Sequence, residues 1–432
     1  MFKHTIETLD NGLQLLRIGL PGAVSVTTLV FSNTGSRYEK PNEYGIAHFF
    51  EHMVFKGTPT YPDPQLLASA IDGIGADFNA FTSREYTGYY IKAASEHLEL
   101  SLDVLSDMLL RPLLKQDDLE RERGVIIEEM NMYKDNPMHH VANLFESMLW
   151  DGSGLSHDII GTQETVKGVN RADFVSFLSR WYGHGNMLVV LAGDADLVMS
   201  EKSRTAVEKA FAKPPEHERS QGKQSPDGLQ SDGFLSQKKL LVVERPTEQA
   251  HLVMGWRGLR RGSEKRHALS MLSVILGGSM SSRLFTEVRE KRGLCYYVNT
   301  DTEYYRETGI FGASAGVETK RVEEAIDVIT AEFVDLASGK RSVTAEELAR
   351  AKSHVEGRMA LSFEDSRSVA QFYGMRQLLQ DTIETPEEVL RQIQAVSIAD
   401  VQALAAELVR EGELRLGVIG PFEEKNFARF VS

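Results

Sequence analysis

The sequence predicts an α+β protein of two homologous domains, each a mainly antiparallel β-sheet covered by helices, joined by a surface linker. A chain of 432 residues is too long for one hydrophobic core. Its halves contain a degenerate repeat, because segments 170–174 and 188–193 recur as 397–401 and 416–420 at a shared offset of 397 − 170 = 227 residues. A repeat of this length indicates duplicated domains rather than a solenoid.

The linker is predicted from composition. Residues 213–233 are rich in Pro, Ser, Gln, Gly and charged residues, which is typical of a segment that runs over the surface. We therefore expect a first domain at 1–212, a linker at 213–236 and a second domain at 237–432. Each copy of the repeat begins with a capping residue and an acidic residue three positions later, which predicts a helix before the repeated strand.

Composition and charge limit the partners and the compartment that we expect for the protein. With 42% hydrophobic and 25% charged residues, the chain is typical of globular proteins. Its net charge of −14 argues against nucleic acid, since no basic field neutralises phosphates. The single cysteine, Cys295, excludes an internal disulfide and favours a reducing compartment. No secretory signal or bilayer-spanning apolar run is visible, so we expect a cytoplasmic protein that binds neither nucleic acid nor membrane.

Local patterns predict the elements of the first half. The turn sequence Asp-Asn-Gly at 10–12 predicts a hairpin, and Asp63 before Pro64 predicts the start of a helix. The other elements expected from periodicity are, in chain order, a strand at 24–31, a helix around 45–55, strands at 77–82 and 86–92, and helices at 95–110 and 116–134.

The helix around 45–55 carries the first candidate site. His48, Glu51 and His52 stand at i, i+3 and i+4, so both imidazoles point to one side with a carboxylate beside them. The spacing His-x-x-Glu-His is the reverse of the commoner zinc-peptidase motif. The alternative is a chance grouping on a surface helix. The apolar residues around the three favour a buried helix, in which these polar groups need partners, and hence a metal site.

A catalytic zinc usually has a third protein ligand. On the helix expected at 116–134, Glu122, Ile126 and Glu129 share one stripe, whereas Glu128 lies on a polar stripe. Glu129 is therefore predicted as the third ligand. Glu122, two turns earlier, is predicted to orient an imidazole, and a surface ion pair is an equal alternative.

These residues resemble a known family. His48 to His52, with Glu129 following after 129 − 52 = 77 positions, resembles the pitrilysin (insulinase) family of zinc metallopeptidases, the inverzincins, and in particular short bacterial homologues of the mitochondrial processing peptidase β subunit. The resemblance implies one Zn²⁺ per chain bound by His48, His52 and Glu129, with Glu51 as the general base that activates the water at the metal. Two imidazoles and a carboxylate also accept cobalt or manganese.

The resemblance also implies where substrate binds. Asn79, Ala80, Phe81 and Thr82 resemble the edge strand to which this family adds an extended peptide, and Phe55 is a further predicted substrate-binding residue. The alternative for this strand is an inner position, paired on both sides.

The second half lacks the metal motif, and residues 266–276 stand in its place. Arg289 and Tyr296, separated by 296 − 289 = 7 positions, match the arginine and tyrosine that peptidases of this family place opposite the zinc. A guanidinium and a phenol can hold a peptide carbonyl and stabilise developing negative charge. From the residues alone, Arg289 is instead part of a solvated helix face that ends at Gly293.

The implied activity is zinc-dependent endopeptidase cleavage of peptides or unfolded polypeptide segments. Single-chain relatives of about twice this length close two halves around a chamber, so we expect a homodimer in which Arg289 and Tyr296 of one subunit serve the zinc of the other. A heterodimer with a related subunit is the alternative. Two other functions stay open, a non-catalytic assembly subunit and a metal hydrolase with a non-peptide substrate.

Overall fold

The computed structural model describes residues 2–213, 215, 217 and 236–431. These form two compact units built from interleaved segments. Of the described residues, the first contains 2–130, 157–213, 215, 217 and 360–385, and the second contains 131–156, 236–359 and 386–431. Most of the linker predicted at 213–236 lies outside the described residues, and the domain boundaries drawn from the sequence repeat stay a prediction.

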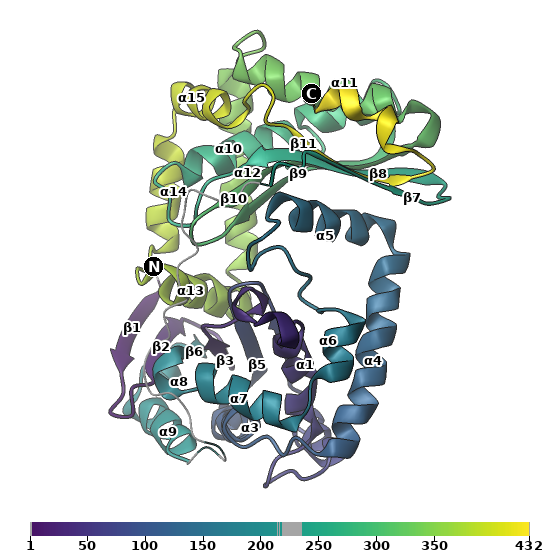
Figure 1. Ribbon diagram of the computed structural model, residues 1–432. Coiled ribbons are helices and arrows are strands. Elements are labelled where there is room, and N and C mark those ends of the chain that lie inside the picture. The colour runs from purple at the N-terminus through teal and green to yellow at the C-terminus, as the bar shows by residue number, and fades with distance from the viewer. Residues whose placement is uncertain (1, 214, 216, 218–235, 432) are drawn as a thin grey trace. The chain divides into compact units, whose positions relative to one another are not determined.

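The first unit is built around a six-stranded sheet with the order β1-β2-β6-β3-β5-β4 (Figure 1). Its strands are β1 (Lys3–Thr8), β2 (Gln14–Leu20), β3 (Ser25–Ser32), β4 (Asp77–Thr82), β5 (Thr87–Ala94) and β6 (Met187–Asp194). Neighbours are antiparallel except for β2 and β6. The predicted hairpin joins β1 to β2, with Gly12 at a φ of 87°. The strands expected at 24–31, 77–82 and 86–92 are confirmed with small shifts of their ends.

Helices cover both faces of this sheet, because successive residues such as Val189 and Val190 of β6 are both fully buried. On one face, Tyr373 of α13 (Ser366–Gln380) packs against a cluster that includes Phe31 and Val190. The other helices of the unit are α1 (Ile46–Met53), α2 (Pro64–Asp72), α3 (Leu98–Leu110), α4 (Gln116–Asp135), α6 (Gln163–Gly168), α7 (Arg171–Trp181), α8 (Ala195–Val198) and α9 (Glu201–Phe211). Its short 3₁₀ helices are η1 (Ser36–Tyr38), η2 (Pro41–Glu43), η3 (Val54–Lys56), η4 (Ser95–His97) and η5 (His184–Asn186).

The second unit contains a five-stranded sheet with the order β7-β11-β8-β10-β9. Its strands are β7 (Leu240–Glu244), β8 (Gln249–Arg257), β9 (Cys295–Tyr304), β10 (Gly309–Glu318) and β11 (Arg415–Gly420). Only β7 and β11 are parallel. This order repeats that of the first sheet without β1, since β7, β11, β8, β10 and β9 take the places of β2, β6, β3, β5 and β4. The predicted duplication is therefore visible in the topology.

Helices also cover both faces of the second sheet. Phe145 of α5 (Pro137–Leu149) packs with Val253 on one face, and Phe333 of α11 (Val322–Ala337) contacts Trp256 on the other. The remaining helices are α10 (Arg266–Gly277), the π-helix η6 (Phe285–Glu290), η7 (Thr319–Arg321), α12 (Ala345–Ser362), α14 (Pro386–Ala395), α15 (Ile398–Leu408), η8 (Glu424–Asn426) and η9 (Ala428–Phe430). Among the described residues, no helix is both long and apolar enough to cross a membrane.

The repeated helices begin as the sequence predicts. Asn170 and Asp173 form a capping box at the start of α7, and Ser397 and Asp400 form the same motif at the start of α15. Each helix precedes the repeated strand, β6 or β11.

Candidate metal centre

The helix α1 begins at a capped and sterically restricted position. Gly45 has a φ of 93°, and a Cβ there would lie 2.5 Å from the carbonyl oxygen of Ile160, so only glycine fits. The buried carboxylate of Glu39 accepts hydrogen bonds from the backbone N–H groups of Gly45 (2.7 Å) and Ala47 (2.8 Å). The first N–H groups of a helix have no partner within the helix, so these bonds satisfy them. A negative charge at the N-terminus also interacts favourably with the helix dipole.

The apolar face of α1 fixes the direction of its polar face. Ala47, Phe49, Phe50 and Met53 are at most 1% exposed. Because residues three and four apart share a side of a helix, packing of these four leaves His48, Glu51 and His52 together on the remaining side.

The three predicted ligands come together in the structure. Glu129 Oε2 on α4 lies 3.7 Å from His48 Nε2 and 3.4 Å from His52 Nε2. One ligand atom of each residue lies within 4.8 Å of the others. Four-coordinate zinc with bonds of about 2.0–2.2 Å places its ligand atoms roughly 3.3–3.6 Å apart, so this donor set fits the ion. Glu128, the rejected neighbour, is exposed.

The two imidazoles have opposite protonation tendencies. Burial lowers the pKa of His48 to about 4, so this ring is neutral at pH 7 and able to bind a metal. Burial also disfavours the charged form of His52, but the carboxylates of Glu122 and Glu129 outweigh it and raise the pKa to about 9. His52 therefore holds a proton that a metal ion must displace.

Glu122 contacts the second imidazole. Its Oε2 lies 3.2 Å from His52 Nδ1, and its Oε1 contacts Lys56 Nζ at 2.6 Å. A carboxylate on Nδ1 fixes the ring so that Nε2 is the atom presented to the metal. The structure brings Glu122 to His52 Nδ1, so its predicted orienting role stays a prediction that the geometry allows; it also forms an ion pair with Lys56, the kind of contact named as the alternative.

Glu51 lies beside the cluster without belonging to it. Its Oε2 accepts a hydrogen bond of 2.6 Å from Thr82 Oγ1. Burial raises the pKa of the Glu51 carboxyl by more than the bond from Thr82 lowers it. A carboxylate with a raised pKa is a stronger base, which suits proton transfer at neutral pH.

The predicted substrate strand, β4, is an edge strand of its sheet and pairs only with β5 among the described strands. The inner-strand alternative is therefore wrong. Asn79 Oδ1 accepts a hydrogen bond of 2.8 Å from the backbone N–H of Ala80. Phe55 of η3 packs against Phe78 of β4, with ring centroids 5.8 Å apart.

Arg289 and Tyr296 lie together in the second unit. The Arg289 guanidinium carbon is 4.9 Å from the ring centroid of Phe285 and 5.5 Å from that of Tyr296, which is 73% exposed. Among the described residues, Arg289 has no carboxylate partner. A guanidinium held by aromatic rings keeps its N–H groups available for a ligand.

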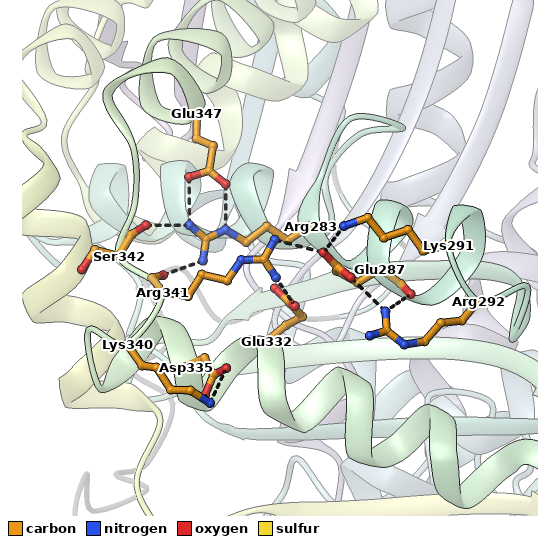
Figure 2. A network of polar contacts seen from close by, with 10 residues as sticks. All are labelled: Arg283, Glu287, Lys291, Arg292, Glu332, Asp335, Lys340, Arg341, Ser342 and Glu347. Carbon is orange, nitrogen blue, oxygen red and sulfur yellow. Dashed lines mark hydrogen bonds and ion pairs between the residues drawn. The ribbon is translucent and has the colours of Figure 1, made fainter.

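Other cations of the same unit have carboxylate partners (Figure 2). Glu287 accepts hydrogen bonds from Lys291 (2.8 Å), Arg292 (2.8 Å) and Arg341 (3.1 Å), and the bonds from Lys291 and Arg292 lower its pKa to about 2. Arg283 is bound by the carboxylate of Glu347 in the same view. Arg289 differs from these four cations in having no acidic partner within the described part of the chain.

Sequence reasoning missed three contacts of this site. The Glu39 cap, the Lys56–Glu122 pair and the Thr82–Glu51 hydrogen bond were not predicted. Helical spacing offered a weak signal for Lys56, which is four residues after His52. The other two depend on how separate elements pack.

Comparison with known families decides the class. Residues 18–163 match the model of the insulinase family, peptidase family M16, and residues 168–355 match that of the M16 inactive domain. The chain belongs to the M16 insulinase family. The metal cluster of this M16 protein comes from the segment that matches the first model, and the second match agrees with the lack of the motif in the second half.

Individual relatives span the whole chain. This M16 protein is 34% identical to the "Uncharacterized zinc protease YmxG" of Bacillus subtilis over 96% of this chain and 97% of the relative. It is 33% identical to an "Uncharacterized zinc protease" of Streptomyces coelicolor over 98% of this chain and 90% of that protein. The crystal structure of a protease from Helicobacter pylori has the same fold, with a TM-score of 0.87, 23% identity and coverage of 98% of this chain and 100% of the other.

Proposed function

We propose that this M16 protein is a zinc-dependent endopeptidase that hydrolyses peptides or unfolded polypeptide segments, with one Zn²⁺ per chain bound by His48, His52 and Glu129. The observation that carries the proposal is the convergence of three ligand atoms within 4.8 Å, beside a carboxylate, Glu51, that is not one of them. Family membership and the names of the relatives support both the metal and the reaction.

The residues of the chain have distinct roles in this reaction. Zinc in such a site polarises the scissile carbonyl and lowers the pKa of water. Glu51 takes a proton from the attacking water while the water oxygen bonds to the carbonyl carbon. The same carboxyl then gives that proton to the leaving nitrogen as the C–N bond breaks. Glu122 keeps the His52 ring in place during these steps.

The open edge of strand β4 favours a peptide as the substrate. An extended segment can add to an open edge through backbone hydrogen bonds, whatever its side chains. Asn79 to Thr82 would hold the segment, and the exposed parts of Phe55 and Phe78 would contact its side chains. Folded proteins rarely offer a free strand, so unfolded segments are the favoured substrates.

A second copy of the chain would complete the site. We propose a homodimer with an enclosed chamber, in which Arg289 and Tyr296 of one subunit bind substrate at the metal centre of the other, and a related subunit in place of the second copy is the alternative. The lack of an acidic partner for Arg289 among the described residues supports a ligand-binding role. We further propose a cytoplasmic location, which the lone Cys295 supports.

One experiment tests the proposed activity and separates it from its rivals. Purified protein is analysed for metal and incubated with a library of quenched fluorescent peptides, with and without a chelator. We expect zinc in the protein and cleavage that a chelator abolishes and added zinc restores. Zinc without cleavage of any peptide would favour an assembly subunit, and activity only on non-peptide esters or amides would favour another metal hydrolase.

The variant Glu51→Gln tests the role of the base. It should retain zinc and lose activity by about 10²–10⁴-fold, because proton transfer is lost while all three ligands remain. Glu120→Gln is the matched control, since Glu120 is an exposed carboxylate on α4 that pairs with Arg123. Near-normal turnover of Glu51→Gln with zinc bound would contradict the assignment.

A further inference from the structure

The side chain of Thr82 faces α1 because side chains alternate between the two faces of β4. Phe81, one residue earlier, packs on the other face of β4, with ring centroids 6.1 Å from Phe31 and 6.2 Å from Tyr86. Since side chains alternate along a strand, Thr82 points to the opposite face. There its hydroxyl lies 2.6 Å from Glu51 Oε2.

The backbone of Thr82 points in a third direction, to the open edge of the sheet. The next residue, Ser83, donates its N–H to the carbonyl of Tyr86, which continues β5. Backbone groups alternate along an antiparallel strand, so those of Thr82 and Ala80 point away from β5. The contact from the Ala80 N–H to the side chain of Asn79 agrees with this direction.

The hydroxyl of Thr82 is the sole hydrogen-bond donor to the Glu51 carboxylate within the described part of the chain. An ionised carboxylate only accepts, so Thr82 is the donor. The distance of 2.6 Å is within the range of about 2.5–2.7 Å for strong O–H···O⁻ bonds. Thr is β-branched, which restricts its χ1 angle and leaves the hydroxyl few alternative directions on a fixed strand.

We infer that Thr82 is a positioning residue, whose backbone receives the peptide at the edge of β4 while its hydroxyl holds the carboxylate of Glu51 in one orientation. The inference rests on the proposed function, in which Glu51 is the base and β4 binds the substrate. It adds that the same residue, Thr82, both binds the substrate strand and orients the base. Loss of the hydroxyl should then slow turnover without weakening binding.

Three variants test this role. Thr82→Val removes the hydroxyl at constant shape, Thr82→Ser keeps it, and Thr82→Ala serves if Val packs badly. Thr27→Val is the matched control, because Thr27 on β3 is buried and its hydroxyl bonds Ser366 Oγ at 2.8 Å. For each we would measure kcat and KM with a quenched peptide, zinc per chain and thermal unfolding.

Peptide affinity is measured separately, without turnover. The Kd of the same peptide is compared between Glu51→Gln and the double variant Glu51→Gln with Thr82→Val. Equal affinities are expected, because the backbone groups of Thr82 that bind the peptide are unchanged. A weaker double variant would assign the hydroxyl to substrate binding and overturn the inference.

The expected result is a split between kcat and KM. Thr82→Val should lower kcat by about tenfold to a hundredfold, the cost of a misplaced catalytic group, with KM and zinc content unchanged. Thr82→Ser should recover most of kcat, and Thr27→Val should keep it. Wild-type kcat in Thr82→Val, loss of zinc, or no recovery with Ser would overturn the inference. The proposed function fails on different grounds, namely a wild-type protein without chelator-sensitive cleavage.

Discussion

At the scale of single residues, the environment gives two adjacent imidazoles different tasks. At His48, burial outweighs the nearby carboxylate of Glu129 and lowers the pKa, so the ring stays neutral, whereas His52 lies between Glu122 and Glu129 and holds a proton until a metal arrives. The same carboxylates that raise the pKa of His52 are the groups that fix its ring and complete the ligand set. The metal-free protein is thus already ordered around a positive charge at the proposed zinc site.

We expect zinc binding to release about one proton per ion between pH 7 and 8. The pKa of His52 in the metal-free fold, about 9, is above its value in the unfolded chain. Protonation of His52 therefore stabilises the fold, fully below about pH 6.5, and this stabilisation is lost as the pH rises through 9. Zinc competes with that proton, so its affinity should rise about tenfold per pH unit from 7 to 9. His48, neutral here, releases none.

Titration calorimetry in two buffers of different ionisation enthalpy counts the protons. Glu122→Gln is the informative companion variant, because losing one carboxylate lowers the pKa of His52 and should reduce the protons released at pH 8. It should also weaken zinc binding by about 10–100-fold. Release of no proton, or of two, would contradict the protonation states assigned here.

The ligand set was predictable from the sequence because it follows helical periodicity. His48 and His52 are on one turn, and the stripe through Glu122 and Ile126 places Glu129 inward and Glu128 outward. The hydrogen bond from Thr82 to Glu51 was not predictable. It joins two elements that are 31 positions apart, and its existence depends on which face of α1 packs on β4.

At the scale of elements, the hairpin of β4 and β5 is fixed at its tip and left open at its edge. The backbone N–H groups of Ser36 and Arg37 donate to the carbonyls of Ser83 (3.1 Å) and Arg84 (2.9 Å), and Arg37 forms a buried ion pair with Glu85. A strand held in this way is ordered before any peptide arrives, which reduces the entropy lost on binding.

Ala80→Pro tests whether peptides add to this edge. The Ala80 N–H points away from β5 and is bonded to the side chain of Asn79, so proline should leave the sheet intact while removing a donor that a substrate strand would take over from Asn79. We expect kcat/KM to fall by about tenfold or more, the value of one hydrogen bond in a desolvated site. Zinc content and circular dichroism should be unchanged, and Ala80→Ser, which keeps the N–H, should resemble wild type. Normal cleavage by Ala80→Pro would exclude strand addition here.

The helix before Gly293 shows a limit of sequence patterns. An ordinary helix ending at Gly293 is expected there, but the helix ends at Glu290; Gly293 follows with a φ of 61° and donates its N–H to the carbonyl of Arg289. The structure instead contains the π-helix Phe285–Glu290, in which Lys291 donates its N–H to the carbonyl of Thr286. Within this helix Glu287 contacts Lys291, Arg292 and Arg341, and the contact with Arg341, which is distant in sequence, is one that helical periodicity cannot predict.

At the scale of the whole molecule, two sheets with the same strand order differ in the residues that they position. The first α-helix after β3, α1, carries two of the three candidate metal ligands, whereas no residue of its counterpart after β8, α10, belongs to a possible metal-binding group among the described residues. The offset of 227 residues predicts this duplication, since it aligns β6 with β11 and α7 with α15. The exchange of segments 131–156 and 360–385 between the compact units follows from tertiary packing, which no repeat in the sequence reports.

The division of labour between the two copies leads to a test of the proposed dimer. The metal cluster and Glu51 belong to the first unit, and Arg289 and Tyr296 belong to the second. Chains carrying Glu51→Gln and chains carrying Arg289→Ala should each be inactive. Co-expression with two affinity tags yields the mixed dimer. If Arg289 acts in trans, that dimer contains one complete site and should show about half of the wild-type activity per dimer.

The reciprocal mixture supplies the control, because it reverses the expectation. A chain with both Glu51→Gln and Arg289→Ala is paired with a wild-type chain. Under the trans arrangement neither site is complete, so activity should be lost, whereas an arrangement within one chain leaves the wild-type subunit active at about half of the normal value. Activity in this second dimer together with none in the first would show that each chain completes its own site, and full activity of Arg289→Ala alone would remove the arginine from the mechanism.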